Sequence, residues 1–196
     1  CTMNVTVVTE QVCGWFGWDH AELEKQVSSV PAGSEGVSFL PYLNGERTPN
    51  LPNGTGVIHG LGARTGSPAH MARAAMEGAT LGLAYGLRRF NELGLTPGEI
   101  RLTGGGSKSG IWRQISADVF GVLVVGLATA EGAGLGGAIQ AAHADGQGSY
   151  EELCGRLVLL DESTRCEPEA EAAGVYREKL DRQVALTGVL KDAGML

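Results

Sequence analysis

The most chemically suggestive part of the chain is residues 102–112, with the sequence LTGGGSKSGIW. The apolar residues just before it predict a short buried strand over residues 100–103, and the three glycines allow a tight turn with close backbone approach. Ser107 or Ser109 is placed to cap a helix over residues 111–120. A strand, a glycine turn and a helix start together expose backbone N–H groups and a positive dipole end, which suits phosphate. The stretch predicts a nucleotide-phosphate loop, with a plain tight turn as the alternative.

Three phosphate-binding patterns compete for this chemistry. Residues 104–109 end in Lys-Ser, but a P-loop requires glycine where Ser107 stands, which excludes a standard P-loop NTPase. Residues 132–137 match the dinucleotide pattern G-x-G-x-x-G, yet residues 126–131 separate them from their strand and no clear acidic strand end follows. The third pattern is a glycine turn at a helix start without a lysine clamp. Such a turn requires Mg²⁺ and an opposing domain to hold the phosphates.

A second candidate region is the proline- and glycine-rich loop over residues 41–56, which contains Tyr42, Glu46 and Arg47. A loop of this length in a compact domain is usually functional or disordered. An adjacent Glu-Arg pair is more often a structural ion pair than a catalytic one. We therefore expect Glu46 and Arg47 to make the loop rigid, with catalysis by either residue as the alternative.

Capping residues and apolar periodicity predict the elements that position these candidates. Asn4 and Asp19 fit the N-caps of two helices that end near residues 16 and 27. Ser67 fits the N-cap of the longest helix, and Gly94 fits the position just past its end. The other expected elements are strands over residues 37–40, 57–61 and 122–125, a glycine-rich loop over residues 130–137 that leads into a helix through about residue 144, and a last helix over residues 168–190. Two successive strand–loop–helix units predict an α/β fold with neighbouring strands.

Two further groups of residues are expected to be structural. Trp15, Phe16 and Trp18 close the first helix, where core packing is the favoured interpretation and an aromatic wall beside a flat ligand is the alternative. The Glu/Lys/Arg face of the helix over residues 168–190 predicts a solvated surface without chemistry.

The longest helix carries a stripe of small residues, Ala74, Gly78, Gly82 and Gly86. Each interior glycine costs roughly 0.5–1 kcal/mol relative to alanine, so three cost about 2–3 kcal/mol. We expect another helix or the sheet to lie close against this stripe, with the helix central and buried.

Composition and charge restrict the classes of function. The net charge of −7 argues against a nucleic-acid or membrane surface, and no apolar run approaches the ~20 residues that span a bilayer. The four cysteines have no C-x-x-C pairing, which favours reduced thiols in a cytoplasmic protein. The chain starts at Cys1 without a methionine or a signal-peptide pattern, so we expect a piece of a longer protein.

Four blocks of sequence occur in a distinctive order: FLPYLNGERTP (39–49), GVIHGL (56–61), HMARAAME (70–77) and LTGGGSKS (102–109). They resemble the C-terminal half of the FGGY family of sugar kinases, and the resemblance covers about residues 1–176. Within the family, the chain is most similar to members that phosphorylate D-xylulose at the 5-position using ATP. The resemblance implies an α/β fold of the actin-like, ribonuclease-H-like ATPase type, a mixed sheet flanked by helices.

The resemblance also implies a two-domain enzyme whose active cleft lies between the domains. Residues 1–196 would be the C-terminal, nucleotide-binding domain, with residues 168–196 as its helical tail, and an N-terminal sugar-binding domain would precede Cys1. The missing part would supply the aspartate that accepts the proton of the sugar hydroxyl. No aspartate of this chain lies in a matching motif, whether Asp19, Asp118, Asp145 or Asp161. We therefore expect the chain alone to lack kinase turnover.

The site residues implied by the resemblance lie mainly in the glycine turn. Gly105 and Gly106 match positions that contact the phosphates and ribose of ATP, Ser109 matches a polar position near the adenine, and Gly104 belongs to the same turn. No catalytic or metal-binding residue is assigned. Looser matches concern the first helix, the aromatic cluster and a second glycine-rich turn that supports the pocket, namely Thr9, Glu10, Trp18, Glu131 and Gly137.

The implied partners are ATP, Mg²⁺, a small sugar and the N-terminal domain, with a homodimer as a further expectation. Three alternatives remain open. The sugar could be another polyol or sugar acid, such as glycerol or gluconate. The chain could be a non-catalytic nucleotide-binding or dimerisation module, or a dinucleotide-binding oxidoreductase domain that uses residues 132–137.

Overall fold

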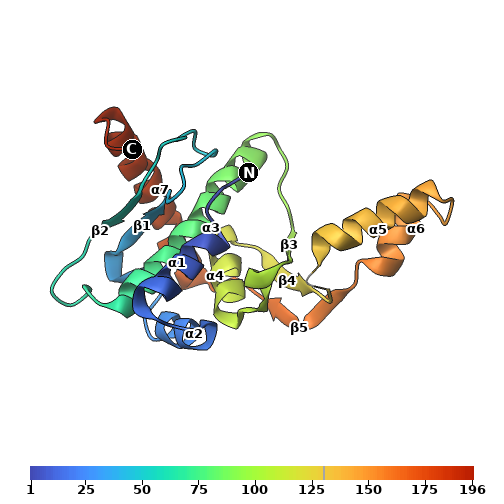
Figure 1. Ribbon diagram of the computed structural model, residues 1–196, viewed down its shortest axis with the longest axis horizontal. Coiled ribbons are helices and arrows are strands. Elements are labelled where there is room, and N and C mark those ends of the chain that lie inside the picture. Colours follow the sequence, from blue (N-terminus) through green and yellow to red (C-terminus); the bar gives the residue numbers. More distant parts are fainter. Residues whose placement is uncertain (130) are drawn as a thin grey trace.

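The structure is a computed structural model that describes residues 1–129 and 131–196. Helices and strands alternate along most of the chain, with two short 3-10 turns labelled η1 (Ser34–Gly36) and η2 (Gly105–Lys108) (Figure 1). The helices are α1 (Thr6–Phe16), α2 (His20–Ser28), α3 (Pro68–Glu92), α4 (Gly110–Phe120), α5 (Gly132–Ala144), α6 (Tyr150–Leu157) and α7 (Ala170–Asp192). The strands are β1 (Ser38–Pro41), β2 (Gly56–His59), β3 (Glu99–Leu102), β4 (Leu123–Leu127) and β5 (Leu160–Cys166).

The strands form two separate sheets. β1 and β2 pair antiparallel, with Phe39 opposite Ile58. β3 pairs in parallel with β4, with Ile100 opposite Val124, and β5 joins β4 antiparallel, so the three-stranded sheet is mixed. The parallel pair is connected through α4, as two successive strand–loop–helix units predict. In this sheet β3 is an edge strand.

Helix α3 lies at the centre of the molecule and contacts α1, α2, α4, α7 and β1 (Figure 1). The core around it is built from small and aliphatic side chains, with one large aromatic residue from α7. Its members include Val8, Val12, Ala75, Met76, Ala79, Ile115 and Tyr176. The prediction of a central helix is therefore confirmed.

The stripe of small residues on α3 is only half covered. A Cβ at Gly78 would collide with the carbonyl oxygen of Phe39, so β1 lies against the helix there, as expected. Nothing lies within 4 Å of a Cβ built at Gly82 or Gly86, and Phe90 is 55% exposed. Within the described residues, the prediction of a fully buried helix is therefore wrong for its C-terminal half.

The first helix begins differently from the prediction. α1 starts at Thr6 with no side-chain cap, whereas Asn4 is buried and its Nδ2 donates to the carbonyl of Gly45 at 2.7 Å and to Glu46 Oε2 at 3.1 Å. The prediction that Asn4 caps this helix is wrong, because contacts with the loop take its side chain instead. The other predicted caps are confirmed at Asp19, Ser67 and Ser109.

Helix α7 is not a solvated tail. Its inner face buries six residues, Ala172, Ala173, Tyr176, Lys179, Gln183 and Thr187. The ammonium of Lys179 donates to Glu77 Oε2 at 2.7 Å and to the carbonyls of Gly33 at 3.0 Å and Val37 at 2.7 Å. The expectation that the charged face of this helix is solvated is therefore wrong for its inner side. Lys179 is buried there because its ammonium pairs with the buried carboxylate of Glu77 on α3.

Glu77 is fully buried and satisfied from several elements. Its carboxylate accepts from the amide of Gly33 at 3.0 Å, the hydroxyl of Ser34 at 2.8 Å, Arg73 Nε at 2.8 Å and the phenol of Tyr176 at 2.9 Å. Burial, and next to it the negative charge of Glu77, raise the pKa of Tyr176. The phenol therefore stays neutral and donates its hydrogen bond. This network ties α3, α7 and the η1 turn together.

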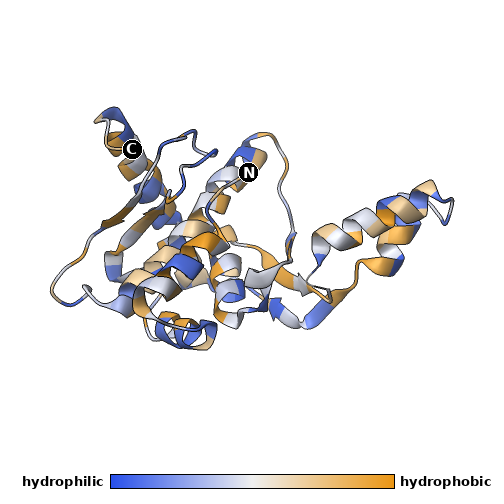
Figure 2. Ribbon diagram, in the orientation of Figure 1, coloured by the Kyte–Doolittle hydropathy of each residue, from blue (hydrophilic) through white to orange (hydrophobic). Residues whose placement is uncertain are grey.

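Helices α5 and α6 form an arm that projects away from the body, and Figure 2 shows apolar residues on this arm as well as in the body (Figures 1 and 2). α5 begins at Gly132, so the glycines of residues 132–137 lie within a helix and not in a phosphate-binding turn. Ala130, the first residue of the expected glycine-rich loop over residues 130–137, lies outside the described residues. α6 and β5 were not expected from the sequence.

The aromatic cluster and the cysteines agree largely with expectation. The rings of Phe16 and Trp18 lie 4.8 Å apart and pack against the core, whereas Trp15 is 45% exposed. All four cysteines are free thiols. In the described part of the chain, no helix is both long and apolar enough to cross a membrane.

Candidate functional site

The turn after β3 is built around Gly104, whose φ of 85° lies in the left-handed region that glycine adopts without strain. Ser107 stabilises the turn, because its hydroxyl donates to the carbonyl of Gly104 at 2.7 Å and its amide donates to the same oxygen at 3.3 Å. The chain then passes through η2 into α4. The predicted strand, glycine turn and helix therefore follow one another as expected, although β3 is only partly buried.

The next two glycines present free backbone donors. Within the described residues, the amides of Gly105 and Gly106 donate to no protein acceptor. A Cβ at Gly106 would lie 3.3 Å from the ring of Trp112, whereas nothing lies within 4 Å of one at Gly105. The turn thus offers two unpaired N–H groups, with open space beside Gly105.

The start of α4 differs from the phosphate site expected there. Ser109 caps the helix by accepting from the amide of Trp112 at 3.3 Å, and its hydroxyl donates to Glu24 Oε1 at 3.1 Å. The same oxygen of Glu24 accepts from the amide of Ile111 at 3.2 Å. A carboxylate from α2 therefore occupies the positive end of the helix dipole, and this position does not suit a phosphate. The free amides of η2 remain as the anion-binding groups.

A cavity of about 580 Å³ lies between the turn, α1, α2 and α3. Of the site residues predicted from the sequence, Gly105, Gly106 and Ser109 line it, together with the more loosely matched Thr9 and Glu10. Gly104 shapes the turn without lining the cavity, and Trp18 packs against the core. The volume falls in the range of roughly 300–1,000 Å³ typical of small-molecule sites.

The cavity has a mixed charge. Glu10 pairs with His20 across 2.8 Å, Glu24 lies beside the start of α4, and Lys108 contributes a positive charge from the turn. The two carboxylates add negative charge and the one ammonium adds positive charge, so these groups by themselves cannot neutralise a triphosphate. Among the described residues, no group of three or more histidine, cysteine, aspartate or glutamate side chains is arranged to hold a metal ion.

Several residues of this site were not found from the sequence. Glu24, His20 and Lys108 were not singled out, and Trp112 closes the cavity while its indole Nε1 donates to the hydroxyl of Thr80 at 2.9 Å. A polar cap signal marked Ser109, but nothing local links Ser109 to Glu24, which lies 85 residues earlier. Contacts between residues so far apart in the sequence form only when the chain folds, so a local sequence pattern does not predict them.

The loop over residues 41–56 lies outside this cavity and is structural. Glu46 accepts from the hydroxyl of Thr2 at 2.5 Å and from the amides of Met3 at 2.9 Å and Arg47 at 2.7 Å. Burial raises the pKa of Glu46, but these hydrogen bonds outweigh burial and hold it below its usual value. Within the described residues, Glu46 and Arg47 form no side-chain ion pair. Glu46 is therefore structural, but its partners lie in the N-terminal segment and not in the side chain of Arg47 as an ion pair would require.

The second glycine-rich segment does not form a turn at the cavity. Glu131 precedes α5 and is exposed, and Gly137 lies within the helix. Gly132 packs so closely on Thr103 that a Cβ would lie 2.7 Å from its hydroxyl. The segment therefore touches the end of β3 through Gly132, and the predicted support from Glu131 and Gly137 remains a prediction.

A model of the FGGY family of carbohydrate kinases, C-terminal domain, matches residues 8–144, which is more than half of the chain. The chain belongs to this family. The actin-like, ribonuclease-H-like ATPase fold expected from the resemblance is confirmed, as is the mixed sheet flanked by helices. The matched span ends with α5, so α6, β5 and α7 lie beyond it.

Named relatives agree with this assignment. The xylulose kinase of Haemophilus influenzae is 41% identical over 182 residues, which are 93% of this chain and 37% of that protein. The structure of ligand-bound xylulose kinase from Lactobacillus acidophilus matches 97% of this chain and 39% of that one, with a TM-score of 0.85 and 27% identity. The structure of gluconate kinase from Lactobacillus acidophilus matches 96% of this chain and 39% of its own chain, also with a TM-score of 0.85 and 27% identity. The chain therefore spans less than half the length of these relatives.

Proposed function

We propose that residues 1–196 form the nucleotide-binding domain of an ATP-dependent sugar kinase that phosphorylates D-xylulose to D-xylulose 5-phosphate. The observation that carries the proposal is the glycine turn after β3. In a chain of the carbohydrate kinase family, two unpaired amides at Gly105 and Gly106 border a cavity of nucleotide size. Backbone N–H groups in such a turn are suited to phosphate oxygens.

The residues present fit ATP at its phosphate and nucleoside ends. The amides of Gly105 and Gly106 and the ammonium of Lys108 are donors for phosphate oxygens, and Ser109 offers a polar group farther along the wall. Bound ATP supplies the phosphoryl group, and this chain orients it. Mg²⁺ bound with ATP would be held mainly by phosphate oxygens and water, with one or two carboxylates, and it would neutralise phosphate charge.

This division of labour agrees with the chemistry of phosphoryl transfer, which relies on positioning and charge stabilisation. The described aspartates do not line the cavity, so none of them is placed there to accept the proton of the sugar hydroxyl. We propose that the base and the sugar site belong to the part of the full-length protein that precedes this domain. Residues 1–196 alone would then bind nucleotide without turnover.

The choice of D-xylulose is supported by the xylulose kinases among the similar proteins. A gluconate kinase resembles the chain equally well in structure, so a sugar acid is the second candidate substrate. If the sugar site belongs to the other domain, this half of the enzyme has little influence on which sugar is used. A homodimer and a cytoplasmic location remain predictions.

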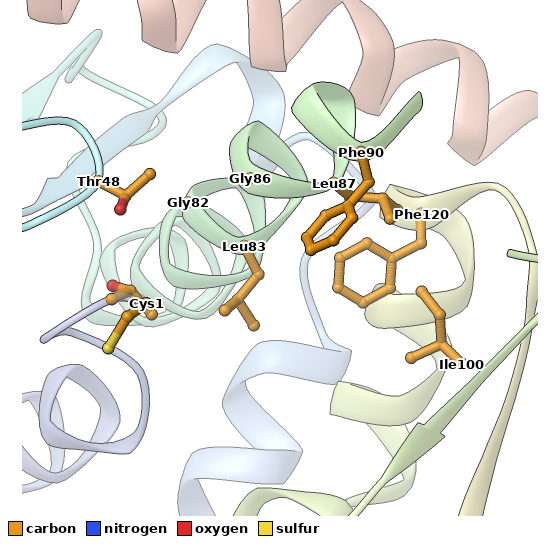
Figure 3. Close-up of a pocket in the computed structure, with 10 residues that line it drawn as sticks. Cys1, Thr48, Gly82, Leu83, Gly86, Leu87, Phe90, Ile100 and Phe120 are labelled. Carbon is orange, nitrogen blue, oxygen red and sulfur yellow. The ribbon is translucent and has the colours of Figure 1, made fainter. Parts of the chain in front are cut away.

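A surface feature supports the proposal of an additional domain. A groove of about 280 Å³ runs along the exposed half of α3 and is lined mainly by Leu83, Leu87, Phe90, Ile100 and Phe120, with Cys1 at one end (Figure 3). We call this surface the α3 groove. Any residue that precedes Cys1 in a longer protein emerges there, and apolar side chains favour a protein neighbour over water.

The experiment compares the full-length protein with residues 1–196. Isothermal titration calorimetry with Mg-ATP and a coupled assay with D-xylulose and gluconate measure binding and turnover. We expect turnover with D-xylulose by the full-length protein, and nucleotide binding without turnover by residues 1–196. Comparable turnover by both would show that the base lies in this chain, and failure of the full-length protein to bind Mg-ATP would overturn the proposed function.

A further inference from the structure

The starting observation is the position of Glu24, which reaches from α2 to the junction between the glycine turn and α4. Its Oε1 accepts from the hydroxyl of Ser109 at 3.1 Å and from the amide of Ile111 at 3.2 Å. The residue also lines the nucleotide-sized cavity. One carboxylate oxygen is therefore fixed by the protein at the wall of that cavity.

The other carboxylate oxygen is uncommitted. Within the part of the chain that the structure describes, Glu24 Oε2 accepts from no donor and forms no ion pair. An ionised carboxylate has about four acceptor sites, and two donors occupy only some of them. Because Oε1 is held, Glu24 has limited freedom to turn away, and it remains an acceptor for a ligand in the cavity.

The distribution of charge orients a nucleotide in the cavity. Glu24 repels phosphate from the start of α4, whereas the amides of Gly105 and Gly106 and the ammonium of Lys108 attract it to the turn. The phosphates therefore lie at the turn, and the nucleoside lies toward Glu24. A nucleoside offers hydrogen-bond donors, namely the ribose hydroxyls and the amino group of adenine.

We infer that Glu24 is a nucleoside-recognition residue, whose free carboxylate oxygen accepts a hydrogen bond from a donor group of ATP. The inference rests on the proposed nucleotide site and assigns a specificity role within it. Glu24 thereby selects nucleotides that carry this donor while it holds Ser109 and Ile111 in place. The donor is either a ribose hydroxyl or the adenine amino group, and analogues that lack each group distinguish the two.

The test measures Mg-nucleotide affinity by calorimetry in the full-length protein, with Glu24→Gln as the variant. The amide oxygen can still accept from Ser109 and Ile111, but its NH₂ group replaces the free acceptor. We expect ATP to bind about tenfold more weakly, as for the loss of one charge-assisted hydrogen bond. Binding of inorganic tripolyphosphate should not weaken, because the substitution removes a charge that repels phosphate. Glu22→Gln is the matched control, because Glu22 lies on the same helix outside the cavity.

Nucleotide analogues identify the group that Glu24 recognises. The wild type should bind one of three analogues about tenfold more weakly than ATP, namely 2′-deoxy-ATP, 3′-deoxy-ATP or inosine triphosphate, according to which donor group Glu24 accepts from. The affected analogue should lose no further affinity in Glu24→Gln, because the same hydrogen bond is already absent.

Two results would overturn the inference without affecting the proposed function. One is unchanged affinity for ATP in Glu24→Gln. The other is an equal loss for ATP, every analogue and tripolyphosphate, since that pattern belongs to a residue that only supports the turn. Thermal unfolding of the variant checks that the fold is retained. If the wild type itself failed to bind Mg-ATP, the proposed function would fall and this inference with it.

Discussion

Three consecutive glycines in the turn after β3 have different reasons to be glycine. Gly104 has a φ of 85°, where a side chain would strain the backbone. Gly106 lacks room, because a Cβ would lie 3.3 Å from the ring of Trp112. Gly105 has neither constraint, since its φ is not in the left-handed region and nothing lies within 4 Å of a Cβ there. We propose that a ligand approaching the backbone is the reason that Gly105 lacks a side chain.

The substitution Gly105→Val tests this reasoning. The isopropyl group would cover the amides of residues 105 and 106, so we expect Mg-ATP to bind at least about tenfold more weakly, the effect of losing one or two hydrogen bonds to a charged ligand. Stability should change little, since the site is open. Calorimetry gives the affinity and thermal unfolding the stability.

A matched control is Gly98→Val, because Gly98 is equally open and lies outside the cavity. Retention of full Mg-ATP affinity by Gly105→Val would remove the glycine turn from the site.

Local signals at this scale were readable from the sequence. A glycine run followed by Ser109 predicts both the turn and the cap, because each depends on residues within one turn of helix. Asn4 carries the same kind of signal, but its side chain is taken by Gly45 and Glu46, about forty residues away. The partnership of Glu24 with Ser109 is equally non-local. The residue types therefore predicted the glycine turn, where we place the phosphates, better than the wall at Glu24, where we place the nucleoside.

At the scale of elements, α7 was predicted as a helix, but its buried face was not. Its charged residues indicated a solvated surface, and no sequence pattern distinguishes Lys179, which is buried, from Lys191, which is exposed. The difference arises because Glu77 of α3 and two backbone carbonyls lie opposite Lys179. In contrast, α3 and α4 could be predicted from the sequence, because the apolar periodicity and the N-cap residue of each helix indicate the same segment.

We predict that Lys179→Met destabilises the protein by about 3–5 kcal/mol, the usual cost of removing one partner of a buried ion pair. The carbonyls of Gly33 and Val37 would lose their donor, and Glu77 would keep only part of its compensation. The free energy of unfolding is measured by urea denaturation followed by tryptophan fluorescence.

Lys191→Met on the same helix should change the free energy of unfolding by less than about 0.5 kcal/mol, as is usual for an exposed side chain. Equal effects of the two substitutions would contradict a stabilising role for the buried ion pair.

At the scale of the whole molecule, the sequence predicted that something covers the glycine stripe of α3, and the described residues cover only Gly78. The α3 groove and the free edge of β3 lie on the uncovered side. Such surfaces are usually buried in proteins, because apolar side chains and unpaired strand edges favour association. The family resemblance identified the fold, but no pattern in the sequence identifies what would cover the rest of this surface.

Gly86→Ala should therefore have opposite effects in two forms of the protein. In residues 1–196 alone, a methyl group in open space should stabilise α3 by about 0.5–1 kcal/mol, the helix propensity difference. In the full-length protein, close packing of the preceding part against α3 should make the same change destabilising. Urea denaturation of both forms measures the sign.

Gly78→Ala is the control, because its contact with β1 is present in both forms and should make it destabilising in each. A stabilising effect of Gly86→Ala in the full-length protein would show that this face remains open.

The buried pair of Glu77 and Lys179 also affects how this sequence can evolve. The two residues lie 102 positions apart, and replacing either one first costs stability. Without Glu77, Lys179 loses its carboxylate in the protein interior, and without Lys179, Glu77 keeps only Arg73 as a counterion. Sequences that drift by single substitutions must therefore pass through a poorly folded intermediate to lose the pair. We expect both positions to be kept together or exchanged together across descendants of this gene, even though neither residue touches the nucleotide cavity.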